Sequence, residues 1–336
     1  MGNVVKAMLN MAFYIEIGDR VLGLLEKVEI HKSVELLADT AQIVLPYANC
    51  GDVVPIETYL KRGMPVSIRL GYEEILKEGQ TVKDLPEEFR GWLQRIDTDK
   101  ETITLECEDD LYLFRKPLEN EVLKKVKVTD LLQKVVKGIG QDFKVVNTYD
   151  WTYEKFVINT ATGYDVLKKV QEECGADIYL KDGELHVHAP GEKIQDKEEN
   201  TVYYDLSKNV EDADLTYRLA EDKKVEVVVK ANMPDGTVKE IKVGATGGEK
   251  VEIICATHDE ASMKLRGELE RKRRSFDGYE GNITTWLLPM CQPGNGAAIH
   301  DAEYKKKDGT YFVTSVTTEF SSAGGKRKVD LGFRLS

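Results

Sequence analysis

Four acidic side chains lie within five positions of one another: Glu106, Glu108, Asp109 and Asp110. Carboxylates held this close can work as a general acid and base, or can bind a divalent cation. The residues Thr102–Glu108 alternate in polarity as a half-buried strand does, which places Glu106 and Glu108 on one face, where they could meet a common ligand. The chemistry open to this segment is therefore acid–base catalysis or ion binding.

The same segment also has a purely structural interpretation. Alternation is what any half-buried strand shows. Asp109 and Asp110 suit the start of a short helical turn over Leu111–Phe114, where acidic side chains favour the helix dipole. We predict that the cluster is structural, and ion binding by the acids from Glu106 to Asp110 stays open as the alternative.

His186 and His188 lie two residues apart in the strand-like stretch ELHVH. They therefore share one face, as a two-histidine metal site would require. No third ligand is evident nearby in the sequence. We interpret both as polar side chains on the solvent face of a hairpin.

Two further motifs raise the question of anion binding. The loop Gly244–Gly248 is rich in glycine, but a phosphate-binding loop needs Gly-Lys-Ser/Thr at the start of a helix, and here Glu249 and Lys250 begin a strand. The basic run Arg271–Arg274 could contact phosphate or an acidic partner. It also falls in the last turn of a predicted helix, where cations favour the dipole. We predict a structural role for both motifs.

The sequence contains no pattern typical of an enzyme. G-x-S-x-G and H-E-x-x-H are absent, and no cysteine has a clearly associated His and Asn. The cysteines are far apart, without a C-x-x-C pair, and are typical of reduced core thiols made in a cytoplasm. They are Cys50, Cys107, Cys174, Cys255 and Cys291. We predict no catalytic, cofactor-binding or metal-binding residues, and no cofactor.

Length and charge limit the function further. The 336 residues suffice for two or three domains with their own cores. With 47 basic and 59 acidic residues the net charge is -12, which repels nucleic acid and anionic lipid. Transient passage of DNA is compatible with this charge, whereas stable binding is not expected. The apolar run from Met8 to Ile15 is far shorter than the roughly 20 residues of a membrane span and predicts a first strand.

The order of predicted elements is β, then α+β, then β. Residues 1–117 show short strands and turns at regular spacing, which predicts a first β-barrel domain. Residues 118–190 contain a helix behind Thr129 and a second from about Thr162 to Gly175, each followed by strand-like residues, which predicts a small α+β insertion. The charged segment Pro190–Asn200 is the best linker candidate.

Residues 191–336 predict a second β-barrel domain with one helix at about 258–275. Thr257 followed three residues later by Glu260 is a capping-box signature for its start. The fold class is therefore mainly β, with two similar β-barrel domains joined by a small α+β region.

The two β regions repeat the same order of parts, which is stronger evidence than any single motif. DTAQIVLP matches NITTWLLP, and RGMPVSIRLGY matches PGNGAAIHDAEY. A hairpin closes each region, EFRGWLQRIDTDKETITLECE in the first and TYFVTSVTTEFSSAGGKRKVDLGFRL in the second. The order of strand, Leu-Pro, Gly turn, strand and hairpin recurs about 230 to 245 positions later, which predicts a duplication.

These segments resemble the baseplate hub proteins of contractile phage tails, also called late control protein D or tail-hub proteins, which have relatives in phage-like injection systems. The resemblance covers nearly the whole chain. It is carried by GWLQRIDTDKETITLECEDDLYLFR, by TATGYDVLKKVQEECGADIYLKDGELHVH and by FDGYEGNITTWLLPMCQPGN with the terminal hairpin.

The resemblance implies a homotrimer whose six barrels form a pseudo-sixfold ring between the tail tube and the central spike. It implies a passage for DNA or tape-measure protein, and synthesis in a host bacterial cytoplasm before assembly into a virion tail or phage-like particle. Because the chain ends at Ser336 after the second hairpin, the spike is expected to be a separate protein. The trimer-contact residues are unknown from sequence.

Two other function classes remain as alternatives. A tail-tip cell-wall hydrolase could use Glu106 or Glu108 as acid and base, since tail tips must cross an envelope. A carbohydrate- or receptor-binding module could use its loops, although the aromatic residues are scattered along the chain. The structural hub is the function that the sequence favours.

Overall fold

The structure is a computed structural model. It describes residues 8–47, 56–75, 81–148, 151–181, 183–188, 200–233, 236–255 and 258–335. Cys50, Thr257 and positions 190–199 of the predicted linker lie outside the described residues.

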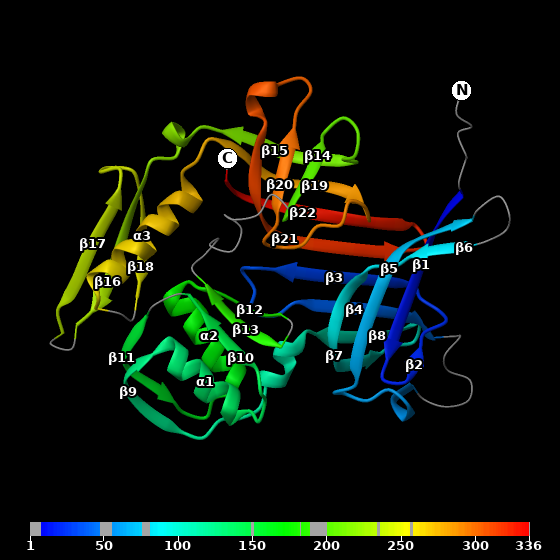
Figure 1. Cartoon of the computed structure of the whole chain (residues 1–336), viewed down its shortest axis with the longest axis horizontal. Helices are drawn as coiled ribbons and strands as arrows, with labels where there is room; N and C mark the ends of the chain where they lie inside the picture. Colours follow the sequence, from blue (N-terminus) through cyan, green and yellow to red (C-terminus); the bar gives the residue numbers. More distant parts are fainter. Residues whose placement is uncertain are drawn as a thin grey trace.

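The first β region forms one antiparallel unit, drawn in blue and cyan in Figure 1. Its strands are β1 (Met8–Ile17), β2 (Arg20–Val21), β3 (Lys27–Ser33), β4 (Thr40–Pro46), β5 (Pro65–Ile75), β6 (Thr81–Asp84), β7 (Glu87–Thr98) and β8 (Thr102–Glu108). They lie in the order β3-β4-β8-β7-β5-β1-β2, with β6 also paired to β5. Alternate residues fill the core, as Ala41, Ile43 and Leu45 do in β4. The N-terminal apolar run is thus a strand, as predicted.

The second β region repeats this order of strands. It comprises β14 (Thr201–Asp205), β15 (Asp212–Arg218), β19 (Gly278–Trp286), β20 (Gly296–His300), β21 (Gly309–Ser321) and β22 (Gly324–Arg334). The pairing β15-β19-β22-β21-β20-β14 corresponds to β3-β4-β8-β7-β5-β1 in the first unit. The direction of one pair differs between the units, because β14 is parallel to β20 whereas β1 is antiparallel to β5.

The repeat extends to individual hydrogen bonds. Both β7 and β21 carry a bulge, after Leu93 and after Val313. At the first bulge the amide of Gly63 donates to the Leu93 carbonyl at 2.8 Å, and at the second the amide of Gly294 donates to the Val313 carbonyl at 2.8 Å. Both glycines have a positive φ, 84° and 90°, a conformation that glycine adopts without steric cost. The predicted Gly turns are therefore equivalent.

The Leu-Pro pairs are the exception. With the bulges aligned, Ile43 in β4 corresponds to Ile283 in β19, since Ile43 pairs with Leu105 and Ile283 with Val329. This register places Leu288 three positions beyond the counterpart of Leu45. The predicted Leu-Pro match is therefore wrong in detail, because the strand period, and not the dipeptide, fixes which residues face the core.

The two units form one continuous sheet. β3 pairs antiparallel with β21, from Ser33 opposite Ser315 to Lys27 opposite Ser321, and Figure 1 shows these strands side by side. We call this contact the β3–β21 seam. The mainly β class with an α+β insertion is confirmed. Hydrogen bonds among the described strands close neither unit into a barrel.

The insertion contains the two predicted helices and the strands predicted after them, together with two strands that were not predicted, β9 (Glu121–Lys127) and β11 (Thr152–Ile158). The predicted elements are α1 (Val128–Gly138), β10 (Lys144–Asn147), α2 (Gly163–Cys174), β12 (Asp177–Lys181) and β13 (Glu184–His188). Helix α2 has a capping box in which Thr162 and Asp165 exchange hydrogen bonds, and it ends at Gly175 in the left-handed conformation. These are the start and stop residues that the sequence indicates.

A second small layer interrupts the second β region. Strands β16 (Val225–Asn232), β17 (Val238–Gly244) and β18 (Glu249–Ile254) form their own sheet, which α3 (Glu260–Arg274) covers. Its core is continuous with that of the insertion. The helix lies where it was predicted, but its N-cap is Asp259, whose side chain accepts from the Ser262 amide at 2.8 Å. The predicted boundaries of the domains stay predictions.

No helix in the described parts of the chain is long and apolar enough to cross a membrane. Short 3-10 turns complete the fold: η2 (Ile56–Thr58), η3 (Asp110–Phe114), η6 (Ala220–Asp222) and η7 (Lys305–Lys307).

A buried ion pair connects the two β units. Arg327 of β22 donates to both carboxylate oxygens of Glu88 in β7, at 2.6 and 3.2 Å, and the two side chains are 1% and 2% exposed. The Thr318 hydroxyl and the Leu287 carbonyl, at 2.9 and 3.0 Å, accept the remaining guanidinium donors. A charge this deep is tolerated only when it is paired and hydrogen-bonded.

Removing one member of this pair is expected to cost far more than removing both. Arg327→Met leaves the Glu88 carboxylate buried and unpaired, which should lower the free energy of unfolding by about 3–5 kcal/mol. The double variant with Glu88→Leu should recover most of that loss. Urea denaturation measures both, with Lys144→Met at the exposed Lys144–Glu184 pair as control, where the change should stay within about 1 kcal/mol. Equal losses in the single and double variants would contradict this account.

Candidate functional site

The acidic cluster lies where β8 ends and η3 begins. Ile103, Leu105 and Cys107 of β8 are buried, as their alternation predicted. Glu106 is half-buried on the opposite face, and Glu108 is only 2% exposed. The two glutamates that the sequence placed together therefore have different environments.

Separate partners hold these two glutamates. Glu106 Oε1 accepts from Arg95 Nη2 at 2.7 Å. Glu108 Oε2 accepts from Arg115 Nε at 2.7 Å and from Gln94 Nε2 at 3.1 Å. A carboxylate already bound by a guanidinium is poorly placed to exchange protons with a substrate, so this geometry favours the structural interpretation.

Asp109 and Asp110 shape the turn that leaves the first unit. Asp109 Oδ1 accepts from the Leu111 amide at 2.9 Å and caps η3, which confirms the predicted helical turn. Asp110 Oδ1 accepts from Trp92 Nε1 at 2.9 Å. Within the described ranges, no group of three or more His, Cys, Asp or Glu side chains is arranged to hold a metal ion.

Asp109 is also paired with a second acid, Asp39, which ends the β3–β4 connection. The Asp39 amide donates to Asp109 Oδ2 at 3.0 Å, and the Asp109 amide donates to the Asp39 carbonyl at 3.0 Å. Burial, with the negative charge of Asp39, raises the pKa of Asp109 to about 8. Burial also raises the pKa of Asp39, whose Oδ1 accepts from the Ser33 amide at 3.1 Å.

The two histidines share one face of β13, as predicted, and are engaged with each other. His186 Nδ1 lies 3.2 Å from His188 Nε2, and both rings stack on Tyr179. His186 Nε2 lies 3.3 Å from a Glu184 oxygen, and His188 Nδ1 lies 2.8 Å from the Thr148 hydroxyl. The result is a polar chain along the hairpin, and both imidazoles are half-buried in it.

The glycine loop and the basic run meet at one hollow. The loop Gly244–Gly248 joins β17 to β18, so a strand follows it, as predicted. The run Arg271–Arg274 forms the last turn of α3, and a hollow of about 290 Å³ lies between Gly244 and Arg271. Each arginine of the basic run is paired with a glutamate. The pairs are Arg271–Glu268, Arg273–Glu35 and Arg274–Glu270.

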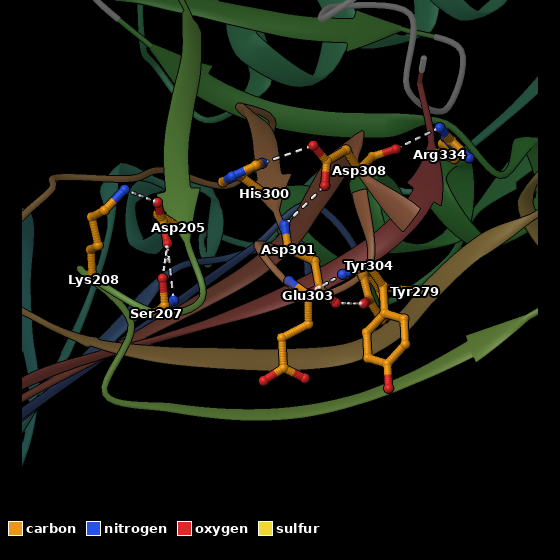
Figure 2. Close-up of polar contacts among 10 residues, drawn as sticks. All are labelled: Asp205, Ser207, Lys208, Tyr279, His300, Asp301, Glu303, Tyr304, Asp308 and Arg334. Carbon is orange, nitrogen blue, oxygen red and sulfur yellow. Dashed lines mark hydrogen bonds and ion pairs between the residues drawn. The ribbon is translucent and has the colours of Figure 1, made fainter. Parts of the chain in front are cut away.

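Sequence reasoning missed a polar network at the β20–β21 connection, which Figure 2 shows. Asp301 Oδ1 accepts from the amides of Glu303 and Tyr304, both at 2.9 Å, and its Oδ2 accepts from the Tyr279 hydroxyl at 2.6 Å. The bond from Tyr279 is the main cause that lowers the pKa of Asp301. Asp residues that bond backbone amides two and three positions on are typical turn formers, which is the signal available in the sequence.

Asp308 closes the other end of this loop. Its carboxylate oxygens bind His300 Nδ1 at 2.8 Å and the Asp301 amide at 2.9 Å, while its carbonyl accepts from Arg334 Nη2 at 2.7 Å (Figure 2). On the neighbouring strand β14, Asp205 binds Lys208 Nζ and the Ser207 hydroxyl, both at 2.6 Å. The carboxylates of Asp301, Asp308 and Asp205 each accept from a backbone amide, so the network is a scaffold for this part of the chain.

A second hollow, of about 630 Å³, opens along β7. Its lining is partly basic, with Lys61, Arg62 and Arg95, and partly apolar, with Leu60 and Ile96. The remaining lining residues are Gln94 and Glu106. It borders Arg95 and Ile96, just beyond the bulge in β7. From Arg95 to Thr98 no described strand pairs with the edge of β7 opposite β8.

No protein-family model and no curated protein matches the sequence. Solved structures do match. The 43 kDa tail protein of a Shewanella oneidensis prophage aligns over 96% of this chain and 98% of its own, with a TM-score of 0.65 and 17% identity. A tail protein of Neisseria meningitidis aligns over 96% of both chains, with a TM-score of 0.62 and 16% identity.

A third match is an Escherichia coli component of the type VI secretion system, described as structurally similar to bacteriophage T4 tail proteins. It aligns over 96% of this chain and 77% of its own, with a TM-score of 0.55 and 11% identity. The duplicated unit with its insertion thus defines a class, the fold of phage tail proteins and their type VI secretion counterparts. The resemblance to tail-hub proteins is confirmed at the level of the fold.

The Asp39–Asp109 pair predicts a pH-dependent stability. The folded-state pKa of Asp109, about 8, exceeds its ordinary value of 3.8. Its stabilising contribution is therefore full below about pH 4 and is lost as the pH rises through about 8. Thermal unfolding should show a melting temperature that falls from about pH 5 to about pH 9.

Asp39→Asn keeps the acceptor for the Ser33 amide and removes the neighbouring negative charge. The fall in melting temperature with pH should become shallower in this variant, because the pKa of Asp109 moves toward its ordinary value. A profile as steep as that of the unaltered protein would exclude the charge of Asp39 as a contributor and leave burial as the cause of the raised pKa.

Glu106 and Glu108 are expected to respond differently to the same change. Glu106→Gln weakens an exposed ion pair and should alter the free energy of unfolding by less than about 0.5 kcal/mol. Glu108→Gln removes a buried charge that Arg115 and Gln94 bind, and should cost about 1–3 kcal/mol. Urea denaturation gives both values. Loss of a peptidoglycan-degrading activity in both variants, irrespective of stability, would contradict the structural role.

Proposed function

We propose that the protein is a structural hub of a contractile phage tail or of a related injection machine. In this role it is a homotrimer that joins the tail tube to the central spike. The single observation that carries the proposal is the duplication, with the same order of strands, the same bulge and the same Gly hydrogen bonds in both β units.

Symmetry explains why a hub would contain such a duplication. Three chains with two similar units each present six similar surfaces, which can match a sixfold tube, while the trimer keeps the threefold symmetry of a trimeric spike. The β3–β21 seam fixes the two units of one chain relative to each other. A single unit per chain would not combine both symmetries.

The charge of the chain suits a passage better than a binding site. At -12 per chain, a trimer carries three times that charge, or -36. A predominantly acidic lumen would let DNA or a tape-measure protein slide through, because phosphates are repelled and not bound. The partners in this proposal are other copies of the chain, the tube protein and the spike protein. The chain would be made in a host bacterial cytoplasm and then assembled into the particle. A strongly basic lumen would contradict this part of the proposal.

A hydrolase of the tail tip gains no support from the geometry. Its candidate residues, Glu106 and Glu108, are bound by Arg95 and Arg115. No observation on the described residues favours it over the structural role, so the hub remains the one function that we propose.

The trimer is directly testable. Light scattering of the purified protein should give three times 37.9 kDa, and negative-stain images should show a six-lobed ring whose average is threefold. A monomer across the micromolar range, without and with a spike or tube partner, would overturn the proposal.

A further inference from the structure

The β3–β21 seam, which is internal to the chain, lies at an edge of β21 whose equivalent on β7 has, beyond the bulge, no described strand beside it. In the second unit, β21 pairs with β20 before its bulge and with β3 after it, on the same edge. In the first unit, β7 pairs with β5 before its bulge, and the following residues Arg95–Thr98 have no described partner on that edge. The hollow of about 630 Å³ lies there. The first unit therefore lacks the strand that β3 supplies to the second.

The strand that would occupy this place is also present and has a free edge. β15 is the counterpart of β3, because each pairs with the equivalent strand, β19 or β4. Aligned through those strands, Asp212–Arg218 of β15 corresponds to Lys27–Ser33 of β3, residue for residue. β15 is the last strand at its end of the sheet, with no described neighbour beyond it. Among the described strands, the same chain thus carries one unfilled position beside β7 and one strand, β15, whose outer edge is unpaired.

We infer that β15 of one copy pairs antiparallel with β7 of the next copy, in the register of the β3–β21 seam. This rests on the proposed hub function, and it names the surfaces by which the copies join. The contact is heterologous, since β15 and β7 lie at different places on the chain, and such contacts form closed rings when the rotation closes. Edge-strand pairing also satisfies backbone groups that would otherwise remain open to aggregation.

The internal seam predicts the contacts in detail. At the end of the internal seam the Val34 amide donates to the Thr314 carbonyl at 3.0 Å. In the proposed seam the corresponding residues are Leu219 of one copy and Gln94 of the next. Leu219 is 41% exposed in the single chain, and burial of such a side chain at an interface is favourable. The amine of Lys32 donates to Gln292 at 2.9 Å across the internal seam.

The counterparts of Lys32 and Gln292 are Tyr217 and Lys61. These two types can form a cation–π contact, and Lys61 lines the hollow along β7. In both pairs a lysine amine faces an electron-rich group, but the lysine lies on the β3 side in the internal seam and on the β7 side in the proposed one. The hollow has the lining that an incoming β15 would need.

Disulfide trapping tests the register. His31 and Thr317 are opposite each other in the internal seam, with His31 Nδ1 3.0 Å from Thr317 Oγ1. Their counterparts are Thr216 and Asp97. In a Cys50→Ser background, the pair Asp97→Cys with Thr216→Cys should oxidise to covalent trimers on non-reducing gels. The matched control, Asp97→Cys with Asp212→Cys, shifts the register and should stay uncrosslinked.

A second pair of variants tests the apolar contact. Leu219→Asp should dissociate the oligomer, whereas Leu265→Asp on α3, at a similar exposure of 46% against 41%, should leave it intact. Light scattering before oxidation gives the oligomeric state for each variant.

The possible outcomes are distinct. If a trimer forms no crosslink between positions 97 and 216, or crosslinks equally in the control, the proposed seam is wrong and the hub function stands. A persistent monomer overturns the hub itself. Crosslinked chains of mixed length support the seam and overturn the closed trimer.

Discussion

The β3–β21 seam is the contact on which the rest of the architecture depends. Seven residue pairs join the units along it. The core beneath is shared, because Leu287 and Phe320 of the second unit pack into the cluster of the first. The ion pair between Arg327 and Glu88 joins the same two units, and it requires the register that the seam sets. Backbone pairing and a desolvated charge pair together fix one relative position for the two units.

Local signals in the sequence predicted the local structure. The period of apolar residues located α1, α2 and the buried face of β8, since burial of one face is what that period records. The first strand was located from a short apolar run, and α3 from a capping signature. Thr162 and Gly175 marked the ends of α2 because each forms its cap with residues at most four positions away. The order of the repeat could be read for the same reason, as each unit is a chain of local hairpins and turns.

Contacts between distant segments could not be predicted in this way. Glu88 and Arg327 are 239 positions apart. The residues next to each of them in the sequence do not distinguish it from a charged residue on the surface. The Leu-Pro match failed because a dipeptide carries no information on register. The cap of α3 was misplaced because Asp259 and Thr257 are both good N-cap residues. At the acidic cluster, Glu106 and Glu108 were correctly placed in a strand, but their separate arginine partners depend on the bulge in β7 and on the turn after β8.

The internal seam and the proposed seam between copies differ in one chemical respect. In the alignment of the units, Arg327 stands where the first unit has Ile103, and the counterpart of Glu88 is Asp308, whose carboxylate is engaged by His300 and the Asp301 amide. A seam built on β7 would therefore contain no buried ion pair. Opening the internal seam leaves an unpaired buried charge, whereas opening the other exposes strand edges and Leu219, beside polar side chains that are already solvated in the single chain. A chain that folds before it assembles needs this difference, with one seam closed in every monomer and the other open until the next copy arrives.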